Sequence, residues 1–118
     1  MKFALQQLYM IEGWALVALG VLHTGSTLRL YNAFTLQAHW FMSAGILMIL
    51  VGALNLLNRK YGGAARGVRL VCIGANIVIL AYSVAGGVLG HADLVAWIIV
   101  LGIVVPLTAL SFSRTVNR

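Results

Sequence analysis

The chain has 118 residues, of which 62% are hydrophobic and only 8% are charged, whereas an ordinary soluble domain has roughly 25% charged residues. A soluble core of this size cannot absorb so much apolar surface. The composition therefore excludes a soluble globular domain and predicts a protein embedded in a membrane.

Four windows are long and apolar enough to cross a hydrocarbon layer about 30 Å thick, which takes about 20 residues of helix. They cover about residues 3–23, 40–57, 68–89 and 94–112. Backbone amides in lipid must bond within their own segment, so each window predicts a helix. Gln6, Gln7 and Glu12 in the first window favour a retained helix over a signal peptide. We expect residues 1–118 to form one all-α integral membrane domain, a four-transmembrane-helix bundle.

The basic residues follow the windows in a strongly one-sided pattern. If the four windows cross the membrane in turn, Arg29 is the only basic residue on one side of it. The other seven of the eight Lys and Arg residues lie on the opposite side. These seven are Lys2, Arg59, Lys60, Arg66, Arg69, Arg114 and Arg118. The positive-inside rule then places both termini in the cytoplasm, in what we interpret as a bacterial inner membrane. No basic surface interleaved with aromatic residues lies outside the windows, so nucleic acid is not an expected partner.

Glycines recur at a spacing of seven residues, which returns nearly to the same face of a helix. Such pairs occur in the first two windows, and the third window extends the spacing to a third small residue. The residues are Gly13 and Gly20, Gly45 and Gly52, and Gly67, Gly74 and Ala81. Stripes of small residues let helix backbones approach closely, which favours association in lipid. We predict that the helices pack along these stripes.

Glu12 is the only carboxylate within a window, at a depth of about 12 Å. An ionised, unpaired acid at that depth is costly, so its side chain is expected to face the bundle interior or to have a partner. Asn76 lies at a matching depth and is the preferred hydrogen-bond partner, and Asn55 lies nearer the cytoplasmic side. The alternatives are that Glu12 binds a proton or a polar ligand together with these asparagines, or that it lines a water-filled crevice.

Three histidines and one aspartate are expected at the outer side of the membrane. They are His23, His39, His91 and Asp93. Imidazole and carboxylate suit zinc or copper, and two histidines on facing helices can ligate a haem iron, so we consider a metal or haem site, with His23 and His39 as the preferred pair. Proton or quinone chemistry is a further alternative. The simplest interpretation is that these amphipathic side chains lie at the membrane interface.

The segment between His23 and His39, TGSTLRLYNAFTLQA, is too polar for lipid and too apolar for water. We expect it to lie along the outer surface as a short interfacial helix or lid.

Three classes of function remain after these exclusions. Nucleophile and base pairs, phosphate-binding loops and paired carboxylates do not occur in the sequence, which favours a protein that is not an enzyme. The leading hypothesis is a non-enzymatic subunit or assembly factor, with the lipid bilayer and other membrane protein subunits, or further copies of the chain, as partners. The alternatives are a binding or transport bundle that uses Glu12, and a membrane enzyme or electron carrier with a histidine-bound metal or haem.

Overall fold

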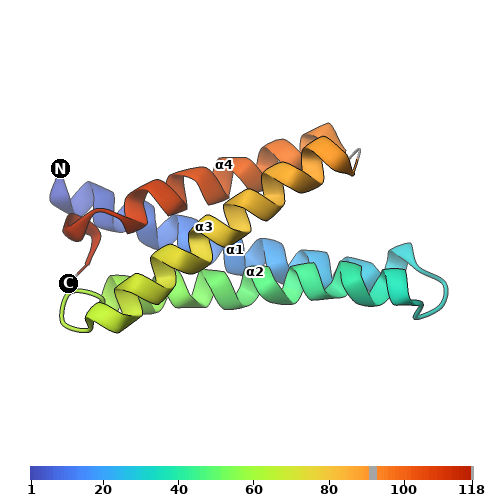
Figure 1. Cartoon of the computed structure of the whole chain (residues 1–118), viewed down its shortest axis with the longest axis horizontal. Helices are drawn as coiled ribbons and strands as arrows, with labels where there is room; N and C mark the ends of the chain where they lie inside the picture. The colour runs from blue at the N-terminus through green and yellow to red at the C-terminus, as the bar shows by residue number, and fades with distance from the viewer. Residues whose placement is uncertain (91–92, 118) are drawn as a thin grey trace.

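The computed structural model describes residues 1–90 and 93–117 and consists of four long helices and one short helical turn (Figure 1). The elements are α1 (Lys2–Leu30), α2 (Leu36–Tyr61), α3 (Arg66–Leu89), α4 (Leu94–Ser111) and the 3-10 turn η1 (Arg114–Val116). All four α-helices are long and apolar enough to cross a membrane. The predicted all-helical fold with four candidate spans is therefore confirmed.

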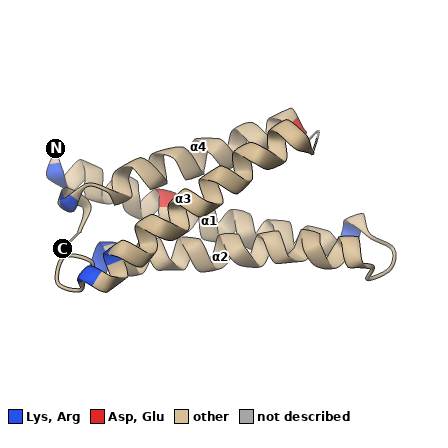
Figure 2. Ribbon diagram, in the orientation of Figure 1, with Lys and Arg blue, Asp and Glu red and all other residues tan. Residues whose placement is uncertain are grey.

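Charge distinguishes the two ends of the molecule. The blue Lys and Arg positions of the ribbon gather at the end that carries both termini, and a single blue position lies at the opposite end (Figure 2). We call the first the basic end and the second, which carries Arg29, the far end. The longest axis measures 46 Å between Cα atoms, which exceeds the hydrocarbon thickness of about 30 Å.

Helices α1 and α2 form a tight hairpin because glycines face each other across it. Gly20 lies against the backbone of Gly45 and Ile49, and a Cβ atom built on Gly20 would come within 2.6 Å of the Gly45 carbonyl oxygen. Gly52 lies in the same way against the backbone of Gly13. A Cβ atom built on Gly52 would come within 2.9 Å of the Gly13 carbonyl oxygen. The predicted packing along the glycine stripes is confirmed for these two helices.

The glycine stripe of α3 does not pack within the chain, so that part of the prediction is wrong. Gly67 and Gly74 are exposed, and a Cβ atom on either would meet nothing within 4 Å. The face of α3 that is buried carries Cys72, Asn76 and Ile79. Polar and aliphatic side chains thus contribute to the inner contact of α3, and Gly67 and Gly74 face outward.

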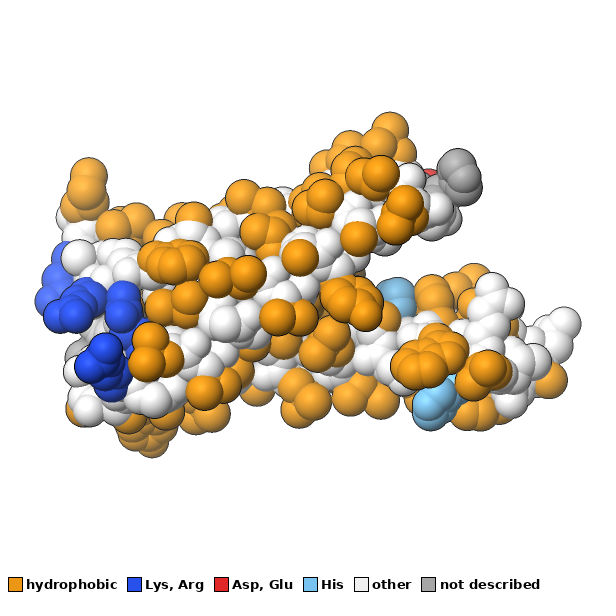
Figure 3. All heavy atoms as spheres, viewed as in Figure 1, with side chains coloured by type: hydrophobic (Ala, Val, Ile, Leu, Met, Phe, Trp, Pro, Cys, Tyr) orange, Lys and Arg blue, Asp and Glu red, His pale blue; other side chains and the backbone are white. Residues whose placement is uncertain are grey.

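The two helical hairpins separate toward the far end. In Figure 1 the α1–α2 hairpin and the α3–α4 hairpin lie together at the basic end and then diverge. The space-filling view shows the same notch between the two arms (Figure 3). The core reflects this shape: it is built around Tyr9, Leu16, Val51, Leu107 and Val116.

The expected lid between the first two spans is absent from the residues described here, because both helices continue into that segment. Helix α1 extends to Leu30 and α2 begins at Leu36. The polar side chains of the segment bond locally: the Ser26 hydroxyl donates to the Leu22 carbonyl at 2.6 Å, and Thr35 caps α2 by accepting from the Ala38 amide at 3.2 Å. Helical structure thus gives Ser26 and Thr35 local partners, whereas the buried Thr24 hydroxyl has no hydrogen-bond partner within the described residues.

The chain after α4 turns back across the basic end. The Gln6 side chain donates to the Thr115 carbonyl at 3.1 Å, and the Asn117 amide donates to the Asn58 carbonyl at 2.7 Å. Val116 between them is fully buried. These contacts fix the C-terminal segment against α1 and α2, which places Arg114 at the surface of the basic end.

Candidate functional site

A buried polar cluster joins α1, α2 and α3 in the half of the bundle nearer the basic end. Asn55 is its centre. Its amide donates to Asn76 Oδ1 at 2.7 Å and to the Val51 carbonyl at 2.8 Å. Its carbonyl oxygen accepts from the Tyr9 hydroxyl at 2.6 Å, from Asn76 Nδ2 at 2.8 Å and from Cys72 Sγ at 3.2 Å. We call Tyr9, Asn55, Asn58, Cys72 and Asn76 the asparagine cluster.

The asparagine cluster is closed to solvent and its central groups are satisfied. Asn55, Asn58 and Asn76 have no exposed surface, and Tyr9 has 1%. Asn58 Nδ2 donates to the Tyr9 hydroxyl at 3.0 Å, which connects the cluster to the C-terminal segment through Asn117. Because every central donor and acceptor has a partner within the chain, the geometry suits a structural role in fixing three helices to one another.

The predicted hydrogen bond between Glu12 and Asn76 is not formed, because Asn76 pairs with Asn55 instead. Glu12 is half-buried on α1, on the turn after Tyr9. Matching depth was the reason for expecting the pair, but the side chain of Asn76 points to α2. The structure therefore brings Asn55 and Asn76 together and leaves Glu12 outside the hydrogen bonds of the asparagine cluster. A binding role for these three residues stays a prediction.

Tyr9, Asn58 and Cys72 belong to this site although they were not among the residues predicted from the sequence. Cys72 and Asn76 lie four residues apart and share one polar face of α3, which is a visible signal in the sequence. Tyr9 and Asn58 carry a weaker signal, since Tyr9 is one of several polar groups in the first window and Asn58 is a single polar group just after the second. Only the packing of α1 on α2 brings the Tyr9 hydroxyl to both Asn55 and Asn58.

The two described histidines have different aromatic neighbours. His23 stacks on Phe41 with ring centroids 3.9 Å apart and an angle of 18° between the planes. His39 lies two residues before Phe41, so it leaves α2 on nearly the opposite side, where it contacts Phe34 and Trp40. The histidine atoms visible in Figure 3 form separate patches accordingly.

No three His, Cys, Asp or Glu side chains lie close enough together to hold a metal ion within residues 1–90 and 93–117. His91 lies outside the described residues, so its part in a metal or haem site is a prediction without a structural counterpart. Asp93 has a local role as the N-cap of α4, because its carboxylate accepts from the Ala96 amide at 3.1 Å. The proposed ligand set of histidines and Asp93 stays a prediction.

A cleft of about 480 Å³ opens between the two arms toward the far end. Its walls are mainly apolar, and His23, Phe41, Ser83, Asp93 and Trp97 contribute to them. His23 Nε2 is buried there without a hydrogen-bond partner, whereas the Trp97 indole donates to the Ser83 carbonyl at 2.8 Å. Such a cleft suits an apolar group that carries a hydrogen-bonding atom. Glu12 does not line it, so it is not the groove from Glu12 to the outer histidines that the transport hypothesis needs.

No protein family model, curated protein or solved structure matches the chain. The functional interpretation therefore depends on the geometry of this chain alone.

Proposed function

We propose that the chain is a non-enzymatic subunit or assembly factor that packs against a larger membrane protein through one face of α3. This outward face carries small residues at helical spacing, namely Gly67, Gly74, Ala81 and Ala85, with Val71 and Val78 between them. All four are exposed. The observation that carries the proposal is the open space around Gly67 and Gly74, in contrast to the close backbone contacts around the glycines of α1 and α2.

Glycines on a lipid-facing helix favour its association with another helix. Lipid chains are as apolar as leucine, so burial of apolar area alone does not hold helices together in a bilayer. Small residues instead allow close van der Waals contact between backbones. The hairpin of α1 and α2 uses its glycines in this way within the chain. The corresponding stripe of α3 supports a contact with a helix of another protein.

The orientation expected from the basic residues belongs to the same proposal. Six described Lys and Arg residues gather at the basic end, and Arg29 lies alone at the far end (Figure 2). The positive-inside rule then supports a cytoplasmic basic end in a bacterial inner membrane.

Single-cysteine variants test the orientation in a Cys72→Ser background. We expect Arg29→Cys to react with a membrane-impermeant maleimide in intact cells, and Ala64→Cys to react only after permeabilisation, because Ala64 lies in the loop between α2 and α3. Labelling of Ala64→Cys from outside intact cells would contradict the orientation.

The packing proposal predicts that a bulky residue at Gly74 releases the chain from its complex. Gly74→Leu places a branched side chain in the closest part of the contact, and overpacking typically costs about 1–3 kcal/mol, or a roughly 5- to 150-fold weaker association. The measurement is the size of the species that contains the chain after mild solubilisation of native membranes, by native gel electrophoresis and immunoblotting.

Gly102→Leu is the matched control, since Gly102 is an exposed glycine within α4 and also has open space around it. We expect the wild type and Gly102→Leu to migrate in a large complex and Gly74→Leu to migrate as the free chain. A wild type that migrates as the free chain, or a Gly74→Leu variant that stays in the complex, would exclude the proposal. A purified chain that forms the same species alone would show a homo-oligomer instead of a subunit.

A further inference from the structure

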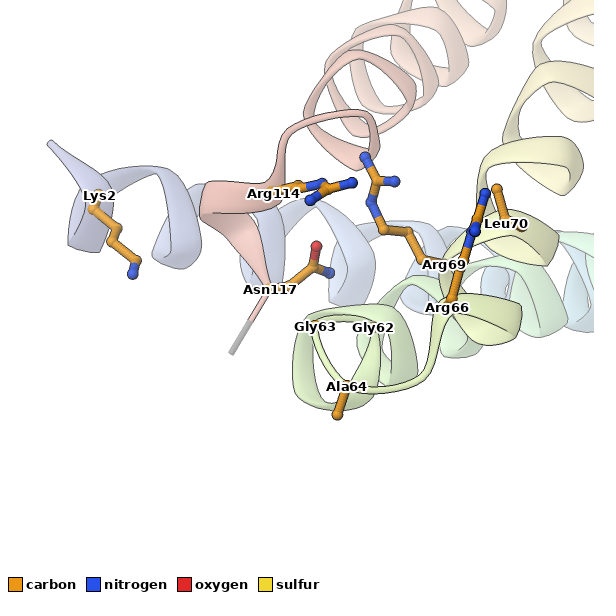
Figure 4. Close-up of a pocket in the computed structure, with 9 residues that line it drawn as sticks. All are labelled: Lys2, Gly62, Gly63, Ala64, Arg66, Arg69, Leu70, Arg114 and Asn117. Carbon is orange, nitrogen blue, oxygen red and sulfur yellow. The ribbon is translucent and has the colours of Figure 1, made fainter.

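A pocket of about 590 Å³ lies at the basic end and is lined by four cationic side chains from separate parts of the chain (Figure 4). Lys2 comes from the start of α1, Arg66 and Arg69 from the first turn of α3, and Arg114 from η1. The loop between α2 and α3 forms another wall. Figure 4 shows the guanidinium groups of Arg69 and Arg114 extending toward each other.

The chain has no acidic residue to neutralise this pocket. It contains only two Asp and Glu residues. Asp93 caps α4 at the far end, and Glu12 lies ten residues after Lys2 on α1, about 15 Å along the helix axis. Four like charges around one cavity repel one another. Negative charge from outside the chain would lower this repulsion.

Two buried polar atoms at the pocket have no hydrogen-bond partner. One is Arg69 Nε and the other is Asn117 Oδ1. The Arg69 guanidinium is held in place, because its NH2 group donates to the Phe112 carbonyl at 2.7 Å. Asn117 is fixed as well, because its amide donates to Asn58. A buried N–H of a charged group that lacks an acceptor is costly, so an anion that bonds to it is favoured.

We propose that this pocket binds the phosphate group of an anionic phospholipid. Arginine presents several N–H groups in a planar fork that matches phosphate oxygens. All four helices begin or end at this level, where lipid head groups lie. The volume exceeds that of one phosphate group and falls in the range of small-molecule pockets, so glycerol of the head group fits beside the phosphate and its hydroxyl can donate to Asn117 Oδ1. The inference does not depend on the outward face of α3.

Lipid retention by the purified chain tests the proposal. The protein is transferred into dodecyl maltoside micelles doped with phosphatidic acid, phosphatidylglycerol or phosphatidylcholine, and bound lipid is counted by native mass spectrometry. Thermal unfolding is followed in parallel, and a further sample receives inorganic phosphate without lipid. The variants are Arg69→Gln and Arg114→Gln, and the control is Lys60→Gln, which removes a charge from the basic end outside the pocket.

We expect one anionic lipid per chain, retained more tightly than phosphatidylcholine, with about tenfold or greater weakening in each pocket variant, in line with the strength of hydrogen bonds to charged groups. Lys60→Gln should retain the lipid. The Arg114 side chain makes no hydrogen bond within the described residues, so Arg114→Gln stays informative if Arg69→Gln does not fold. If inorganic phosphate stabilises the wild type but not Arg114→Gln, the result would support a phosphate site in the pocket. The bound phosphate would then come from a soluble ligand. Equal retention of phosphatidylcholine, retention by Arg114→Gln, or equal loss in Lys60→Gln would overturn the proposal.

Discussion

Replacing Gly20 with alanine is expected to destabilise the protein by about 2–3 kcal/mol, the upper part of the range for overpacking. The added Cβ atom would lie 2.6 Å from the Gly45 carbonyl oxygen and 2.8 Å from the Ile49 backbone nitrogen. These neighbours are backbone atoms, so they cannot turn aside as a side chain can. The two helices must separate instead, and the contacts along the whole hairpin weaken.

Gly74→Ala is the matched control for this prediction, because Gly74 is a mid-helix glycine with open space around it. Alanine favours helix over glycine by about 1 kcal/mol, so the purified control variant should be as stable as the wild type or slightly more stable. Denaturation by increasing mole fraction of dodecyl sulfate in mixed micelles, followed by circular dichroism, measures both. Equal stability of the Gly20→Ala and Gly74→Ala variants would show that α1 and α2 are not in backbone contact.

Replacing Asn55 with leucine is expected to destabilise the protein by about 3 kcal/mol. The change removes the carbonyl oxygen that accepts from the Tyr9 hydroxyl and both hydrogen bonds between the Asn55 and Asn76 side chains. These groups are buried, and each buried polar group left without a partner costs about 1–3 kcal/mol. The same denaturation experiment measures the loss.

A double variant separates the loss of hydrogen bonds from poor packing. Changing both Asn55 and Asn76 to leucine removes both members of the pair, and such paired replacement is often nearly neutral. We expect the double variant to lose less stability than the sum of the two single variants, by about 1 kcal/mol or more. Ser83→Ala removes a bond to the carbonyl of Ile79 on its own helix and should change stability by less than about 0.5 kcal/mol. An Asn55→Leu variant as stable as Ser83→Ala would contradict the structural role of the asparagine cluster.

Length and hydropathy were enough to predict the four helices, because the bilayer sets the length of a span and leaves few alternatives to helix. The spacing of glycines also predicted how α1 and α2 meet, since consecutive helices joined by a short turn are neighbours. The same spacing was misleading for α3. A glycine stripe identifies a smooth face, but it does not say whether that face meets the same chain or another molecule.

The candidate site was predictable only in part, because the sequence does not give the rotation of each helix about its own axis. Depth in the membrane can be counted along the chain, and it placed Asn76 level with Glu12. Which way Asn76 points depends on the rotation of α3, and the pairing of Asn76 with Asn55 shows a different orientation from the one expected. The return of the C-terminal segment was also missed, because a single 3-10 turn has no periodic pattern.

The divergence of the two arms has a consequence for the surrounding bilayer. The two arms part toward the far end (Figure 1), so the outline of the chain in that view widens like a wedge. A wedge displaces more area in one leaflet than in the other, which introduces a bending stress unless other molecules fill the wider side. In a bilayer, acyl chains that entered the gap between the arms would relieve that stress, and we expect the packing of lipid in that leaflet to affect the angle between the arms.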